Sequence, residues 1–255
     1  MYIYKRVNIL HVIFIFLVSN MIEEHQIPQN FDSNDPDVLE AYQHETKGQY
    51  EAAIEHYKRA IERSPDLGIV YKHLGNCLYR FGKVEEAIPY FEKGCELMPS
   101  FPTIFYETGL AYYRIGSLKK GLEKIEKALQ LDNNLIIAHY WAGILNYHRG
   151  NLKEAYKYFK HIIETNPNYL IAYFHFGVVN LRMGNYEEAA DSLSYLVNKN
   201  PEAPAAYALL GEAYLNLNNK YEARKAFKKA LELDPDDVKA KNGLALLDDF
   251  NEAII

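Results

Sequence analysis

Apolar residues recur along most of the chain at spacings of three and four, the period of a helix that buries one face. Two neighbouring stretches show this clearly: IVYKHLGNCLYRF at 69–81 and VEEAIPYFEKGCELM at 84–98. Each predicts an amphipathic helix roughly 20 Å long. A glycine separates the two stretches and a proline follows the second, so the pattern predicts a helix–turn–helix unit.

This unit repeats every 34 residues. Six blocks follow one another without insertion or deletion, at 34–67, 68–101, 102–135, 136–169, 170–203 and 204–237. A first slot is small in every block: Ala41, Gly75, Gly109, Gly143, Gly177 and Gly211. A second slot holds Gly48, Gly82, Gly116, Gly150, Gly184 and Asn218, and a third holds Ala53, Ala87, Gly121, Ala155, Ala189 and Ala223. A fourth slot holds Pro65, Pro99, Pro167, Pro201 and Pro235, with Asn133 in the third block.

Each slot has a physical meaning. The second accepts only glycine or asparagine, as a left-handed residue just after a helix end requires. Small residues in the first and third slots let the two helices of a block approach closely, and a larger residue there would overpack them at a cost of ~1–3 kcal/mol. The prolines mark the start of the next block.

Residues in several slots agree in phase with a known signature: Leu74-Gly75, Gly82, Ala87, Phe91 and Pro99 in block two, and Tyr207, Leu210-Gly211, Tyr214, Ala223, Phe227, Ala230 and Pro235 in block six. Over 34–237 the chain resembles the tetratricopeptide repeat family. Departures are local, at Glu40, Ile162 and Leu196. The resemblance implies an all-α, right-handed superhelical solenoid of six 34-residue helix-turn-helix repeats. Because a terminal repeat needs a cover, we expect 238–255 to form a C-terminal capping helix.

The N-terminus leaves two alternatives open. Lys5 and Arg6 precede the apolar run VNILHVIFIFLV at 7–18, so residues 1–21 have the outline of a signal or anchor segment. The chain would then be exported or membrane-anchored. If translation starts instead at Met21, the protein is cytoplasmic. Residues 22–33 are acidic and aperiodic, which predicts a linker.

Composition and motifs argue against catalysis and against several classes of partner. The formal net charge of −6 is wrong for a nucleic-acid-binding surface. Only Cys77 and Cys95 are present, which excludes a disulfide framework, and the nine histidines are dispersed. No phosphate-binding loop, nucleophile elbow or zinc-binding helix motif occurs. We therefore expect no enzyme activity, no cofactor and no metal.

The resemblance implies instead a concave groove, lined by the first helix of each repeat, that binds a peptide or a partner helix. The residues that it assigns to the groove are Lys72, Asn76, Tyr79 and Arg80 in block two, Tyr106, Leu110, Tyr113 and Arg114 in block three, Tyr140, Trp141, Ile144, Tyr147 and His148 in block four, and Phe174, Val178, Leu181 and Arg182 in block five. An aromatic groove edged by bases suits a protein or peptide with apolar and acidic residues. We place its centre at Tyr113, Arg114, Trp141 and Tyr147.

Each block brings an aromatic or apolar residue next to a base, in the pairs Tyr79-Arg80, Tyr113-Arg114, Tyr147-His148 and Leu181-Arg182. These pairs predict a ladder of rungs along the groove. A structural explanation is also open, because aromatic residues can fill the space between helices and a base near a helix C-terminus favours the helix dipole.

Other functions can be weighed against this one. In one subfamily, repeats bind the C-terminal carboxylate of chaperones, and Lys72 and Asn76 match its first pair, but Glu107, Ile137 and Trp141 replace the remaining ligands. An acid would repel a carboxylate, so the sequence argues against this clamp. An envelope or secretion-system structural subunit anchored by its N-terminus is the main alternative. An RNA-binding repeat protein and a regulatory module of a separate enzyme are weaker ones.

Overall fold

The computed structural model describes residues 35–252, with side chains to residue 248, and this part of the chain consists of helices joined by short turns, with no strand. The predicted signal or anchor segment and the acidic linker lie outside the described residues. The helices are α2 (Pro36–Thr46), α3 (Tyr50–Arg63), α4 (Gly68–Arg80), α5 (Val84–Leu97), α6 (Pro102–Arg114), α7 (Leu118–Leu131), α8 (Ile136–His148), α9 (Leu152–Thr165), α10 (Leu170–Met183), α11 (Tyr186–Lys199), α12 (Pro204–Asn216), α13 (Lys220–Leu233) and α14 (Val238–Glu252).

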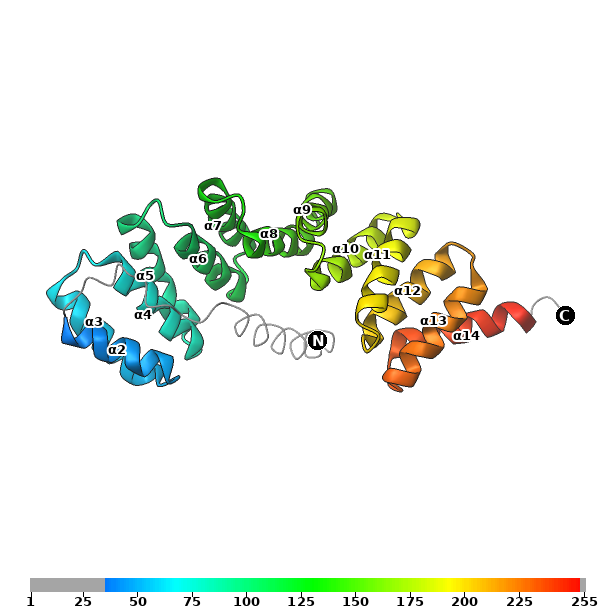
Figure 1. Ribbon diagram of the computed structural model, residues 1–255, viewed down its shortest axis with the longest axis horizontal. Helices are drawn as coiled ribbons and strands as arrows, with labels where there is room; N and C mark the ends of the chain where they lie inside the picture. The colour runs from blue at the N-terminus through cyan, green and yellow to red at the C-terminus, as the bar shows by residue number, and fades with distance from the viewer. Residues whose placement is uncertain (1–34, 253–255) are drawn as a thin grey trace.

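The helices form pairs that follow one another in a curved row, with α7 and α9 on the outer side of the arch and α6 and α8 on its inner side (Figure 1). Each helix packs against the helices before and after it in the chain, and first helices such as α4 and α6 also touch one another. The prediction of an all-α helical-repeat solenoid is confirmed. The last helix, α14, packs on α12 and α13 and buries Ala240 and Leu247 against the last repeat, as a capping helix does.

The turn inside each pair has the backbone predicted from the second slot. Gly82 has φ +91° and Asn218 has φ +57°, the only positive φ of a non-glycine residue in the described range. After α4, the amide of Gly82 donates to the carbonyl of Tyr79 and that of Lys83 donates to the carbonyl of Leu78, at 3.2 and 2.9 Å. These two hydrogen bonds end the helix. They form because Gly82 has a left-handed backbone conformation.

Part of the core lies between the two helices of each pair. One slot on the second helices is almost fully buried in every block, at Tyr57, Phe91, Ile125, Phe159, Leu193 and Phe227. Its side chain packs where the first-slot residue of the facing helix leaves room. In block three the two backbones approach closely, because a Cβ on Gly109 would lie 2.7 Å from the Ile125 side chain and 3.0 Å from the carbonyl oxygen of Gly121. The small residues in these slots therefore set the distance between paired helices.

Candidate partner-binding groove

The predicted groove residues lie on α4, α6, α8 and α10, the first helices of blocks two to five. Their exposure divides them into three groups. Four bases are exposed: Arg80, Arg114, His148 and Arg182. Nine residues are half-buried: Lys72, Asn76, Tyr79, Leu110, Tyr113, Tyr147, Phe174, Val178 and Leu181. Four residues are buried: Tyr106, Tyr140, Trp141 and Ile144.

The bases form a ladder whose contacts run between successive blocks. The Arg114 guanidinium lies 5.2 Å from the ring centre of Tyr79, one block earlier, and that of Arg182 lies 4.7 Å from the ring centre of Tyr147. Arg114 and Arg182 each therefore lie over a ring of the preceding block. Within block four, the adjacent rings of Tyr147 and His148 also meet edge to face, with ring centres 5.5 Å apart.

The other two bases, Arg80 and His148, also contact a tyrosine of the preceding block, through hydrogen bonds. The Tyr113 hydroxyl lies 3.3 Å from Nε2 of His148, with the rings 5.8 Å apart. Arg80 donates from Nη1 to the Tyr50 hydroxyl at 3.3 Å. The ladder therefore links successive blocks to one another, and its bases remain accessible to solvent.

The four buried residues are core residues and do not form the groove surface, which corrects the prediction for them. Tyr140 is fully buried, and its hydroxyl lies 3.0 Å from Nε2 of His175 on the next first helix. Ile144 is 1% exposed, and Trp141 is 4% exposed with its ring 5.2 Å from Tyr113. These side chains, with Tyr106, fill the space between neighbouring blocks. Among them, Trp141 packs against the ring of Tyr113. Burial also raises the pKa of the Tyr106 and Tyr140 hydroxyls.

One charge of the groove is neutralised inside the protein. Lys72 on α4 forms an ion pair with Glu107 on α6, at 3.1 Å, and both side chains are half-buried. Glu107, the acid that departs from the chaperone-binding pattern, therefore neutralises Lys72, the lysine that matches this pattern. Arg80, Arg114 and Arg182 are left as the exposed arginines on this face.

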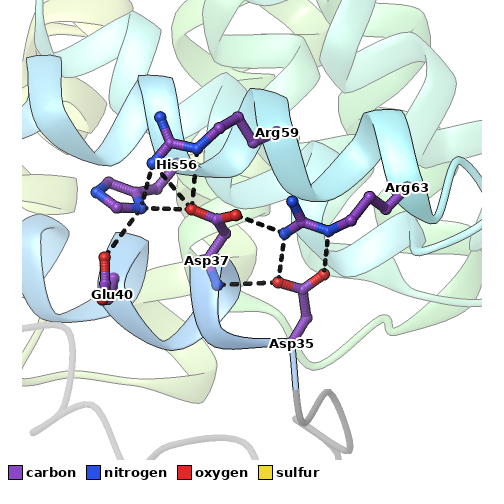
Figure 2. Close-up of polar contacts among 6 residues, drawn as sticks. All are labelled: Asp35, Asp37, Glu40, His56, Arg59 and Arg63. Atoms are coloured by element: carbon purple, nitrogen blue, oxygen red, sulfur yellow. Dashed lines mark hydrogen bonds and ion pairs between the residues drawn. The ribbon is translucent and has the colours of Figure 1, made fainter.

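A charged cluster fastens the first pair of helices (Figure 2). Arg59 and Arg63 on α3 both reach the carboxylate of Asp37 on α2, and Arg63 also binds Asp35, the N-cap residue of that helix. His56 lies 2.7 Å from Asp37 through Nδ1. The two arginines hold the pKa of Asp37 well below its usual range.

In the same cluster, Asp37, Glu40 and His56 are close enough to share a cation, and they form the one such group within the described residues. The carboxylate oxygens of Asp37 are already bound by Arg59 and Arg63. A dication there would have to displace two guanidinium groups, so the cluster is better explained as the fastening between α2 and α3.

The cysteines have a packing role. Cys77 and Cys95 are both buried free thiols, and burial raises the pKa of each, which disfavours the reactive thiolate. Cys95 contacts the hydroxyl of Thr108 at 3.3 Å.

One feature was missed at the sequence level. A pocket of about 310 Å³ lies between α9, α10 and α11, with walls that include Tyr173 and Tyr195. A signal for it exists in the repeat pattern, because Tyr195 occupies a slot that holds a base in every other block.

None of the helices in the described range combines the length and the hydrophobicity that a membrane crossing requires.

Comparison with known families and structures agrees with this architecture. Models of the tetratricopeptide repeat (TPR) match residues 40–100, 138–169 and 176–238, which together make up more than half of the chain. The crystal structure of YrrB, described as a TPR protein with an unusual peptide-binding site, is 25% identical, covers 74% of this chain and 97% of its own, and superposes with a TM-score of 0.68. The MamA protein is 27% identical over 68% of this chain and 94% of its own, with a TM-score of 0.63.

A third structure resembles the chain in fold alone. It is the C-terminal part of a TPR repeat-containing protein from Cytophaga hutchinsonii, 17% identical over 83% of this chain and 85% of its own, with a TM-score of 0.70. Comparison with curated proteins gave no match.

Proposed function

We propose that this chain, which belongs to the tetratricopeptide repeat family, is a non-enzymatic adaptor or assembly scaffold. Its groove along α4, α6, α8 and α10 binds an extended peptide or a helix of a partner protein. The likeness to YrrB, a TPR protein with a peptide-binding site, supports a peptide ligand.

The observation that carries this proposal is the ladder of exposed arginines that contact tyrosines of the preceding block. Arg114 and Arg182 keep one face of the guanidinium on a ring and the rest toward solvent. Stacking restricts the arginine before any partner arrives, so less side-chain entropy is lost on binding. A positive, aromatic edge on a protein of net charge −6 favours acidic residues in the partner.

The spacing of the rungs suggests the form of the ligand. Packed helices lie ~8–10 Å apart, and an extended peptide advances ~3.3 Å per residue. An acidic residue at about every third position would therefore meet successive rungs, while the residues between them contact half-buried groups such as Leu110, Tyr147 and Leu181.

The test is a triple charge reversal of Arg80, Arg114 and Arg182 to Glu. The matched control reverses Lys119, Lys153 and Lys228, three exposed bases on second helices, and changes the net charge by the same amount. Affinity capture from the native source with unmodified protein first identifies the bound protein, and circular dichroism verifies that both variants remain helical.

We expect the control to retain that protein and the arginine variant to lose it. Undiminished capture by a folded arginine variant would show that the ladder does not bind the partner. Equal loss in both variants would reduce the effect to net charge and also contradict the proposal.

A further inference from the structure

The pocket between α9, α10 and α11 lies on the side of α10 that faces away from the groove. Tyr173 and Phe176 point into it, whereas the predicted groove residues of α10 lie about 150° around the helix. Its walls are aromatic. Tyr173 stacks on Tyr195 with ring centres 4.4 Å apart, and Tyr156 lies 5.0 Å from Phe176. Four rings from three helices therefore surround one space.

Acids dominate the edge of this pocket. Its charged lining residues are three carboxylates and one ammonium: Glu164, Glu188, Asp191 and Lys160. Lys160 lies 4.0 Å from Glu164, which leaves Glu188 and Asp191 without an ion pair among the described residues. Both are exposed at the start of α11.

Comparison with the other blocks shows that the aromatic residue at 195 is peculiar to block five. The slot of Tyr195 holds a base in all the others: Arg59, Lys93, Lys127, His161 and Lys229. A ring has replaced a positive charge in the pocket wall, and the repeat architecture does not require that ring.

The rim of the pocket also lacks a lysine that blocks four and six have. In blocks four and six, the acid in the slot of Glu188 pairs with a lysine three residues later: Glu154 with Lys157 at 2.8 Å, and Glu222 with Lys225 at 3.6 Å. In block five, Asp191 stands in the slot of that lysine, as Glu55 and Glu123 do in blocks one and three. Compared with blocks four and six, block five therefore has neither base and one more acid at this place.

Aromatic faces and carboxylates both attract cations. Two lysines of the chain already lie beside these rings. The Lys160 ammonium is 5.6 Å from the ring centre of Tyr156, and the Lys199 ammonium is 5.7 Å from the ring centre of Tyr195. Both lysines are exposed and remain at the edge.

We propose that this pocket binds an arginine side chain of a partner protein. A planar guanidinium stacks on a tyrosine face and donates at the same time to two carboxylates, which a compact ammonium does not do as well. The volume of about 310 Å³ is at the small end of ligand pockets and suits one long side chain with its backbone. The solenoid thus carries a second binding surface, separate from the groove and opposite in charge preference.

The test uses the full chain, labelled with ¹⁵N and titrated with N-acetyl-arginine N-methylamide. The neutral control ligand is the citrulline analogue, in which a urea replaces the guanidinium. We expect saturable shifts of the Tyr173, Ser192 and Tyr195 amides, and binding of the citrulline analogue at least about fivefold weaker. Equal binding of both ligands, or no saturable shift at these amides, would overturn the proposal.

Two variants test the residues. Glu188→Gln with Asp191→Asn should weaken binding of the arginine probe at least about fivefold, whereas Glu86→Gln with Glu123→Gln, the acids of the same two slots in earlier blocks, should leave it unchanged. Tyr195→Lys restores the base of the other blocks and should abolish the shifts while the chain stays folded. Unchanged probe binding by folded Tyr195→Lys would also refute the assignment.

Discussion

The same substitution at two facing glycines should destabilise the fold at one of them and not at the other. Gly109 on α6 and Gly121 on α7 face each other where these two helices cross, and each can be replaced by alanine. Alanine is favoured over glycine in a helix interior by ~0.8–1.0 kcal/mol, so both variants gain equally from this term. What separates them is the space that the new methyl group enters.

At Gly109 the methyl group would lie 2.7 Å from two carbons of Ile125 and 3.0 Å from the carbonyl oxygen of Gly121. Ile125 is fully buried. Overpacking of this kind costs ~1–3 kcal/mol, which exceeds the helix term. We therefore expect Gly109→Ala to destabilise the fold by about 1 kcal/mol.

At Gly121 the methyl group would lie 3.0 Å from the carbonyl oxygen of Gly109 and no closer than 3.4 Å to anything else. Other blocks hold alanine in this slot, and Ala87 and Ala155 are fully buried there without disrupting their pairs. A few tenths of an ångström of adjustment accommodates it. We expect Gly121→Ala to be neutral or to stabilise the fold by up to about 1 kcal/mol.

Thermal unfolding followed by circular dichroism measures the difference. For a chain of this size, ~1 kcal/mol corresponds to a Tm change of about 2–4 °C. Because repeat arrays need not unfold in one step, the whole curves should be compared with that of the unmodified protein as well as the midpoints. If Gly109→Ala is as stable as Gly121→Ala, the crossing does not limit the distance between the helices and the reasoning fails.

Three further predictions concern stability. Phe91→Ala removes a buried ring and should cost ~3–5 kcal/mol, seen as a large fall in the urea midpoint, and a change below 1 kcal/mol would contradict the assigned core. Gly82→Ala meets nothing within 4 Å but requires φ +91°, so a cost of ~1–2 kcal/mol should arise from the backbone alone, and an unchanged Tm would argue against the left-handed turn. Arg59 and Arg63 lower the pKa of Asp37 below its ordinary 3.8, so this carboxylate stabilises the fold above that pH and the contribution is lost as pH falls through the folded-state pKa. Asp37→Asn should therefore lose less stability between pH 7 and pH 3 than the unmodified chain, and equal losses would contradict it.

The fold was predictable because its rules are local. A glycine or asparagine in one slot of every block requires only the steric preference of a single residue, and Gly82 and Asn218 both have the expected positive φ. Small residues at the crossings follow from the contact between two helices that are neighbours in the chain. Neither inference needs the relative position of distant segments.

The details of the groove depend on how one block sits on the next, and periodicity does not contain this information. Arg114 on the first helix of block three lies over the ring of Tyr79 on the first helix of block two. Tyr140 and Trp141 are buried, although the more exposed Tyr147 lies on the same helix. A sequence slot gives the helix and its approximate face, but the neighbouring block decides which side chains it covers.

In a repeat protein, a residue that conforms to its slot is explained first by architecture. The ladder residues conform: Arg80, Arg114 and Arg182 share one slot and link successive blocks, so reversing them should weaken the packing between blocks as well as any partner binding. Tyr195 does not conform, and its replacement by lysine restores what the other blocks already tolerate. Loss of binding with unchanged stability is therefore expected at the pocket, whereas at the ladder binding and stability should change together. Variants of the pocket therefore distinguish an effect on binding from an effect on stability more clearly than variants of the ladder do.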